Sequence, residues 1–143
     1  MYRLGTSTLE ALAAGVPTAP VARYFEYWLL RLQGVYPPHI VCHRCGTALD
    51  AEATGANLDA DGHRFTCPDC AGQTMGEDAR GVTLSPDALA FLAASGRVPP
   101  TSLAGVPLSA RVDRELEVVH RSLMRLHLEK ELRSTRVLRD LRR

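Results

Sequence analysis

The chain has 143 residues, of which 45% are hydrophobic and 23% charged, and its formal net charge is +1. This length and composition are typical of a globular chain that buries a core without disulfides. No apolar run approaches the roughly 18 residues of a membrane span, and no apolar signal region follows Arg3. A membrane-spanning or secreted protein is therefore not expected, and the expected location is the cytoplasm.

The small net charge conceals two regions of opposite sign. Between positions 48 and 90 there are eight acidic residues and only two basic ones, both arginines. Between positions 121 and 143 there are eight basic residues and only three acidic ones. Seven of those eight bases are arginines, and a guanidinium group matches carboxylate or phosphate oxygens bidentately. The C-terminal region is therefore the part expected to bind an anion.

Two helices are predicted before residue 40. The first covers residues 1–14, although weak helix formers in its first half favour a start near Ser7. Its apolar residues are Leu4, Leu9, Leu12 and Ala13. The second helix carries an apolar stripe at helical spacing and ends at Gly34. We interpret this stripe as core: Val21, Tyr24, Phe25, Trp28, Leu29 and Leu32.

From residue 40 the pattern changes to short pieces. Residues 57–60 and 63–66 flank Asp61-Gly62, the signal of a β-hairpin with a two-residue turn. Residues 73–80 are predicted to be a loop.

Helices return after residue 84. Ser85, Pro86 and Asp87 begin one in the usual way, with a capping hydroxyl and an acid in the first turn. Residues 98–106 are expected to form a linker across the surface. Ser109 is predicted to cap the longest helix, and Ser134 or Thr135 a short last one. The long helix has an apolar seam of Val112, Leu116, Val119, Leu123 and Leu126.

Four cysteines carry the strongest chemical signal. Cys42, Cys45, Cys67 and Cys70 form two C-x2-C pairs with 21 residues between them, the pattern of a tetrahedral zinc site. Four thiolates leave no vacant position, so Zn²⁺ is expected to be structural, and its loss is expected to unfold mainly this region. The rival chemistries are a redox C-x-x-C motif and a rubredoxin-like iron site. The redox motif needs a thiol at a helix N-terminus, and the proline-bearing linker before Cys42 makes that motif less favoured.

These elements predict a mainly α fold class, a helical bundle with an inserted small zinc-ribbon-like β module. A single domain, 1–143, is expected, with N-terminal helices at 1–39, the insertion at 40–80 and C-terminal helices at 81–143. No P-loop, nucleophile elbow, G-x-G-x-x-G or H-E-x-x-H motif is present, so an enzyme is not expected. His43 and His63 are interpreted as exposed, and His120 and His127 as lying on a solvated or half-buried face.

The order of these features resembles the C-terminal region of the RecO family of bacterial DNA-repair proteins. The likeness covers almost the whole chain. It rests on residues 23–34, 42–46, 67–72 and 84–89 and on short matches between 127 and 138.

The resemblance implies a recombination mediator that binds single-stranded and double-stranded DNA and anneals complementary strands. It further implies that the partner RecR joins it in helping RecA displace single-strand-binding protein, whose acidic tail docks on the helical domain. It also implies a nucleoid-associated location. The family's N-terminal OB-fold would precede Met1. Glu129 and Glu131 stand where the family tends to have glycine and proline, so a softer bend is expected after the long helix.

The expected function is therefore a non-enzymatic recombination-mediator domain. Its expected site for DNA or an acidic peptide comprises Arg121, Arg125, Leu126, Lys130, Leu132, Arg133, Arg136 and Arg139. The alternative is a zinc-ribbon adaptor that works through protein contacts without binding nucleic acid. A thiol–disulfide oxidoreductase is a third possibility.

Overall fold

The computed structural model of the chain describes residues 2–49, 55–72 and 81–142. Its elements are α1 (Tyr2–Ala13), α2 (Thr18–Leu32), β1 (Ala56–Leu58), β2 (Phe65–Thr66), α3 (Pro68–Ala71), β3 (Val82–Leu84), α4 (Pro86–Ser95), the 3-10 helix η2 (Pro100–Gly105) and α5 (Ala110–Leu141). The predicted loop at 73–80 lies outside the described residues.

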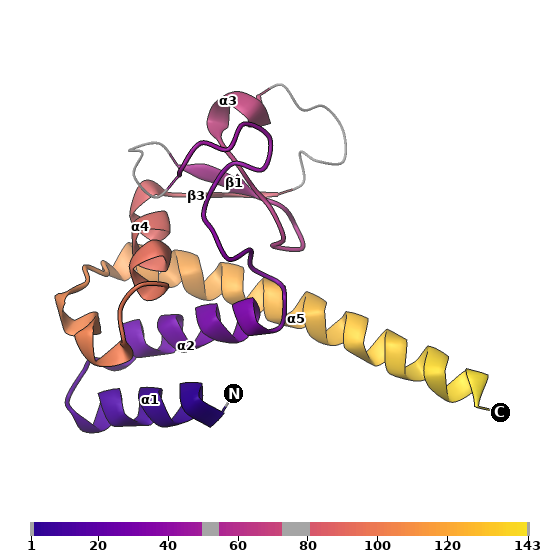
Figure 1. Cartoon of the computed structure of the whole chain (residues 1–143), viewed down its shortest axis with the longest axis horizontal. Coiled ribbons are helices and arrows are strands. Elements are labelled where there is room, and N and C mark those ends of the chain that lie inside the picture. The colour runs from indigo at the N-terminus through magenta and orange to yellow at the C-terminus, as the bar shows by residue number, and fades with distance from the viewer. Residues whose placement is uncertain (1, 50–54, 73–80, 143) are drawn as a thin grey trace.

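The elements form two parts that pack on each other. The helical body consists of α1, α2, α4, η2 and the first half of α5, with α2 beside both α1 and α5 (Figure 1). The cysteine module consists of the loop at 40–49, the three strands and α3, and it lies on one side of the body (Figure 1). The predicted fold class, a helical bundle with a small cysteine-bearing β module, is confirmed.

The first helix buries a different face from the predicted one. α1 begins at Tyr2 and not near Ser7, and its buried residues are Thr8 and Ala11. Leu9 is 68% exposed. Thr8 can be buried because its hydroxyl donates to carbonyl oxygens of the preceding turn, at 2.9 and 3.0 Å.

The buried face of α2 is rotated from the predicted stripe. Its apolar members in the core are Pro20, Val21, Tyr24, Tyr27 and Leu30. Trp28 is only half-buried and Leu32 is exposed. The Trp28 indole lies at the edge because its N–H donates to the Ser95 carbonyl at 2.9 Å, while the Arg31 guanidinium lies 4.6 Å from the ring centroid.

The cysteine module is built on a three-stranded antiparallel sheet with the order β2-β1-β3. Pairing of β1 with β2 confirms the predicted hairpin. The predicted two-residue turn is wrong, because residues 59–64 connect the two strands. Strand β3 was not predicted, since three residues are too few to show a strand period.

The long hairpin tip packs against the helical body. Gly62 has a φ of +80°, and a Cβ there would lie 2.8 Å from Leu123 Cδ2 and 3.0 Å from Val35 Cγ1. The His63 ring nitrogen Nδ1 lies 3.0 Å from the Val35 carbonyl oxygen. These contacts hold the hairpin tip against the helical body.

The Gly62→Ala variant tests this packing. It is expected to lower the free energy of unfolding by the cost of a left-handed alanine, about 1–2 kcal/mol, plus the cost of displacing two side chains. Gly34→Ala is the matched control, since Gly34 has a φ of +78° with no atom within 4 Å. Urea unfolding should show the larger loss for Gly62→Ala, and equal losses would contradict the packing.

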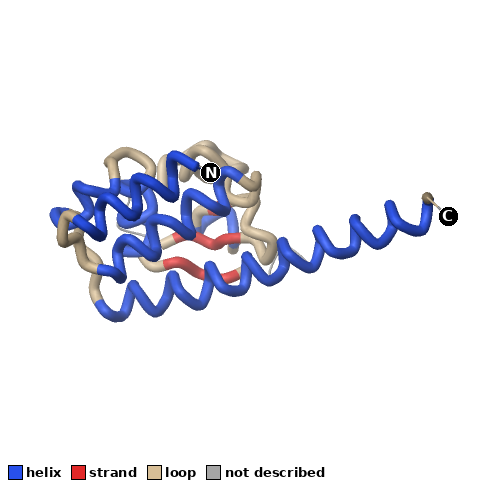
Figure 2. The backbone as a smooth tube through the Cα atoms, turned by 90° about the horizontal axis from the view of Figure 1, so that it is seen from below, coloured by secondary structure: helices blue, strands red, loops and turns tan. Residues whose placement is uncertain are grey.

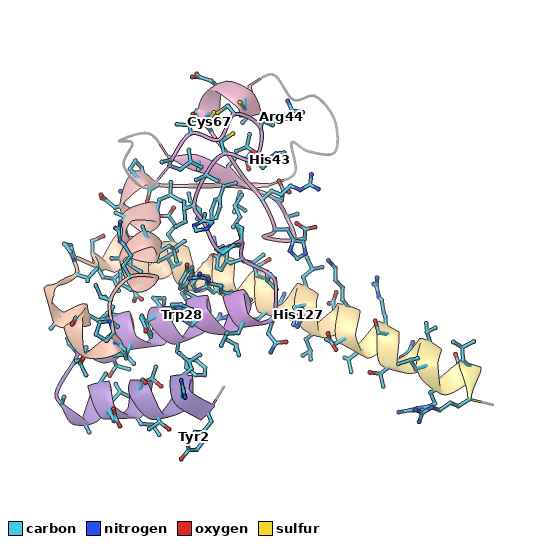
Figure 3. All side chains as sticks on the ribbon, viewed as in Figure 1. Tyr2, Trp28, His43, Arg44, Cys67 and His127 are labelled. Atoms are coloured by element: carbon cyan, nitrogen blue, oxygen red, sulfur yellow. The ribbon has the colours of Figure 1, made fainter. Side chains whose placement is uncertain are left out.

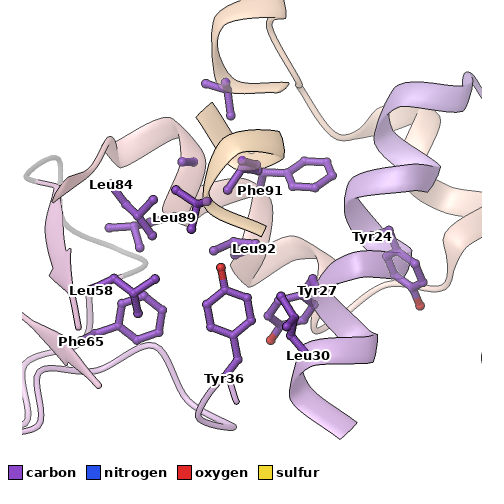
Figure 4. Packing of buried hydrophobic residues seen from close by; sticks show 14 of the residues in the cluster. Tyr24, Tyr27, Leu30, Tyr36, Leu58, Phe65, Leu84, Leu89, Phe91 and Leu92 are labelled. Atoms are coloured by element: carbon purple, nitrogen blue, oxygen red, sulfur yellow. The ribbon is translucent and has the colours of Figure 1, made fainter. Parts of the chain in front are cut away.

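One hydrophobic core joins the body and the module. Tyr36 of the loop after α2 stacks on Phe65 of β2, with ring centroids 6.1 Å apart and planes inclined by 4°. Leu58, Leu84 and Leu92 are completely buried in the same cluster (Figure 4). The module is therefore supported by the helices as well as by its cysteines.

The helix starts at α4 and α5 agree with prediction. The hydroxyl oxygens of Ser85 and Ser109 accept hydrogen bonds from the N–H groups of Ala88 and Val112, both at 3.2 Å. The predicted surface linker between these helices is wrong, because η2 folds there and buries Leu103, which is 1% exposed.

The predicted short last helix is also wrong. α5 runs as one helix to Leu141, and no glycine or proline interrupts it. The Thr135 hydroxyl donates to the Glu131 carbonyl at 3.0 Å instead of capping a new helix. The expected soft bend is absent, and the second half of α5 projects beyond the body (Figures 1 and 2). No described helix has both the length and the apolarity of a membrane span.

A largely buried polar cluster lies between α2 and α5, in which His120 is fully buried and the other side chains are partly exposed. Arg23 forms ion pairs with Glu26 at 2.7 Å and with Asp113 at 3.2 Å. The Nδ1 atom of His120 lies 3.6 Å from the Glu26 carboxylate. His120 is 0% exposed, so the prediction of a solvated or half-buried position is wrong for it, whereas His127 is half-buried.

Candidate metal centre and basic helix face

The four cysteines converge from two separate segments. Cys42 and Cys45 lie in the loop after α2, and Cys67 and Cys70 lie at the start of α3. Their four sulfur atoms lie within 4.8 Å of one another, and those of Cys45 and Cys67 are 3.8 Å apart. Thiolates bound tetrahedrally at about 2.3 Å from an ion lie about 3.8 Å apart. The donor set therefore fits a metal ion.

Local backbone geometry forms each pair. Gly46, with a φ of +76°, turns the chain so that its N–H donates to the Cys42 carbonyl at 2.8 Å. The Cys67 sulfur accepts a hydrogen bond from the Cys70 N–H at 3.4 Å. An isolated parallel β-bridge between the backbones of Cys42 and Phe65 holds the first cysteine pair beside β2, the strand that leads into Cys67.

The pKa values of Cys42, Cys45 and Cys70 are shifted in different directions. Burial of the Cys42 thiol favours its neutral form, but backbone N–H groups, that of Cys67 foremost, outweigh burial and lower the pKa to about 6. The Thr47 hydroxyl and N–H lower the pKa of Cys45. The pKa of Cys70 is raised to about 12, because its thiol is hydrogen-bonded to the Cys67 sulfur. A bound cation would let all four ionise.

The group consists of thiols alone in the described part of the chain. Cys42 and Cys67 are buried, Cys45 is exposed and Cys70 is half-buried. His43 and His63 are exposed, as predicted, and neither belongs to the group. Four sulfur donors fill a tetrahedral shell, so the centre has the chemistry of a structural metal site.

The predicted basic residues divide between two sides of α5. One set, with Leu128 added, recurs at an average of about 3.6 residues, one helical turn, and therefore forms a single stripe. We call it the outer stripe: Arg121, Arg125, Leu128, Leu132, Arg136 and Arg139. Leu126, Lys130 and Arg133 lie on the side that continues from buried Leu123. Leu128 was missed by the sequence prediction, although its spacing could have identified it.

The outer stripe is open to solvent along its length. All six side chains are exposed, and Leu128 and Leu132 are 60% and 61% exposed. Arg121 pairs with Glu117 at 2.8 Å. Among the described residues, no carboxylate pairs with Arg125, Arg136 or Arg139. Uncompensated guanidinium groups next to uncovered leucines are typical of a binding surface for an anionic partner.

The similarity to known proteins extends over both the four cysteines and the outer stripe of α5. The family model "Recombination protein O C terminal" matches residues 1–136. A DNA repair protein RecO from Koribacter versatilis (strain Ellin345) is 27% identical over 143 residues, which are 99% of this chain. The chain spans 54% of that relative's length. No solved structure gives a significant match.

Proposed function

The chain belongs to the family of RecO C-terminal regions, and from this premise we propose that it serves DNA repair as a non-enzymatic recombination-mediator domain. In this role it binds single-stranded and double-stranded DNA and acts with RecR and the tail of single-strand-binding protein, and indirectly with RecA. Its place of action is the cytoplasm, at the nucleoid. The single observation that carries the proposal is the outer stripe of α5.

The stripe suits an extended polyanion. From Arg121 to Arg139 it extends about 27 Å along the helix at 1.5 Å per residue. It lies largely on the half of α5 that projects from the body, where a strand of DNA has free access (Figure 2). Arginine binds backbone phosphates without reading sequence, so this interface favours affinity over base specificity.

The metal in this proposal is Zn²⁺, bound by Cys42, Cys45, Cys67 and Cys70. Soft thiolate donors in a tetrahedral arrangement select zinc or iron. We favour zinc because Zn²⁺ has no redox chemistry, so a structural role needs no further groups around the site. When bound, it links the loop at 40–49 to α3 and contributes folding energy.

Charge reversal on α5 tests the interface. Arg125→Glu/Arg136→Glu is expected to weaken binding of labelled oligothymidylate roughly tenfold or more at about 50 mM salt, because two phosphate contacts become repulsive. Lys130→Glu/Arg133→Glu is the control with the same change of charge on the other side of the helix. Fluorescence anisotropy over a salt series measures both. Equal losses, or no salt-sensitive binding by the wild-type chain, would sink the proposal.

A second candidate is docking of an acidic peptide with an apolar end. It is favoured by the exposed Leu128 and Leu132 between arginines. Anisotropy with an acidic peptide ending in Pro-Phe should show that Leu132→Ser weakens peptide binding while DNA binding is kept. The alternative function, a zinc-ribbon adaptor, predicts no affinity for nucleic acid even at low salt.

A further inference from the structure

One face of the hairpin in the cysteine module carries polar residues, of which Arg64 is exposed, Asn57 half-buried and Thr66 7% exposed. Leu58 and Phe65 are 0% and 2% exposed and point into the core, so alternation places Asn57, Arg64 and Thr66 on the opposite face of the sheet. Asn57 pairs directly with Thr66. Their side chains therefore lie next to each other, with that of Arg64 beside them.

The first cysteine pair adds two more polar residues to this face. The His43 N–H donates to the Phe65 carbonyl at 2.9 Å, which holds His43 and the following Arg44 against β2. Figure 3 shows both on the same side of the module. A hollow of about 30 Å³ results, which we call the hairpin hollow. It is lined chiefly by Arg44, Arg64, His43, Asn57, Thr66 and Asp59.

The lining has an excess of positive charge. Within the described ranges, neither Arg44 nor Arg64 has an ion-pair partner, and the two guanidinium groups outnumber the single carboxylate, that of Asp59. Asn57 and Thr66 add amide N–H and hydroxyl donors. Three separate segments supply these groups, so their meeting depends on the fold and differs from a run of charges along one solvated helix face.

We propose that the hairpin hollow binds a backbone phosphate of a nucleic acid. Space of this size holds an atom as large as a water oxygen, and a phosphate oxygen has that size. The guanidinium fork matches phosphate oxygens bidentately. The site lies on a different element from the outer stripe, so it anchors the bound strand at a second point. This proposal rests on the nucleic-acid binding proposed above.

The test uses the full chain with two probes. In the first arm, inorganic phosphate is titrated at constant ionic strength and backbone amide shifts are followed by NMR. We expect shifts at Arg44, Arg64 and Thr66 that disappear in the Arg44→Gln/Arg64→Gln variant. Both arginines are exposed, so the variant should keep the thermal midpoint of the wild-type chain. Phosphate shifts that avoid the hollow would overturn the proposal.

In the second arm, anisotropy with labelled oligothymidylate is measured across salt concentrations. The variant should reduce the slope of log affinity against log salt by about 0.7 for each phosphate that the hollow no longer neutralises. Arg3→Gln/Arg111→Gln is the control with the same change of charge, because both residues are exposed and lie on α1 and at the start of α5. It should keep the wild-type slope.

The outcomes separate this proposal from the proposed function. If the wild-type chain binds DNA, the outer-stripe variant loses affinity and the Arg44→Gln/Arg64→Gln variant keeps the wild-type slope, the hairpin hollow is refuted and the proposed function stands. If the wild-type chain shows phosphate shifts at the hollow without binding DNA, the proposed function fails and the assignment of the phosphate to nucleic acid is overturned.

Discussion

The Cys45→Ser variant is expected to lose a large part of the chain's folding stability, although the Cys45 side chain is exposed. Structural zinc contributes about 10–16 kcal/mol in zinc-finger peptides at neutral pH, whereas whole domains have only about 5–15 kcal/mol of net stability. Because Cys45 contributes almost nothing to the core, its replacement removes a metal ligand with little loss of packing. Even partial loss of metal binding should therefore lower the thermal midpoint strongly.

The loss should extend beyond the cysteine module. The sequence predicts that mainly the module unfolds, but Phe65 stacks on Tyr36 and the hairpin tip packs on Leu123 of α5. When the module unfolds, these partners in the helical body lose their covering. The near-ultraviolet circular dichroism of the buried tyrosines should therefore change together with the module.

Thermal unfolding with and without a zinc chelator measures this effect. His43→Ser is the control, since His43 is exposed and lies between two of the cysteines without belonging to the four-thiol group. It should keep both the bound metal and the midpoint. A chain that unfolds at the same temperature after chelation, or a Cys45→Ser variant as stable as the wild type, would show that the centre contributes no folding energy.

The second large effect is expected from Arg23→Met. Arg23 is the cation between two carboxylates, and the side chains of Arg23, Glu26 and Asp113 are 12%, 19% and 27% exposed. Removing one partner of a buried pair leaves an uncompensated charge, which costs about 3–5 kcal/mol. The partial exposure of Asp113 places the expected loss toward the lower end of that range.

Chemical denaturation can separate charge from packing at this site. Adding Glu26→Gln to Arg23→Met should restore part of the lost free energy of unfolding, because one stranded carboxylate is then neutral. Arg121→Met is the exposed control, since the Arg121–Glu117 pair is 68% and 39% exposed, and it should cost less than about 1 kcal/mol. If Arg23→Met costs no more than Arg121→Met, the buried cluster does not stabilise the fold as described.

Local features could be read from the sequence because neighbouring residues suffice to produce them. Two residues between cysteines turn both sulfurs toward one point, so the spacing of Cys42 with Cys45 and of Cys67 with Cys70 predicted the cluster. Ser85 and Ser109 satisfy N–H groups three residues later in the chain. The hairpin was predicted from its turn residues, although the tip is longer than expected.

Burial could not be read in the same way. α1 and α2 carry apolar side chains on more than one face, and the face that is buried depends on the neighbouring elements. Leu9 and Leu32 are therefore exposed, while Thr8 is buried. Leu103 looked like part of a linker but fills a gap beside α1 and α2. His120 is buried because its turn of α5 faces Glu26 and Tyr36.

The sequence by itself determined the donor set of the metal centre, the two capped helices and the basic character of the C-terminal region. Only the tertiary structure decided how those basic residues are presented. The core covers one side of α5 as far as Leu123, and beyond that turn the helix leaves the body. The helical period therefore places Arg121, Arg125, Arg136 and Arg139 on one continuous stripe that is open to solvent. Lys130 and Arg133 lie on the other side of α5, the side that continues from the core. The physical reason is that helical spacing sets which residues share a face, whereas long-range packing sets which face remains in solvent.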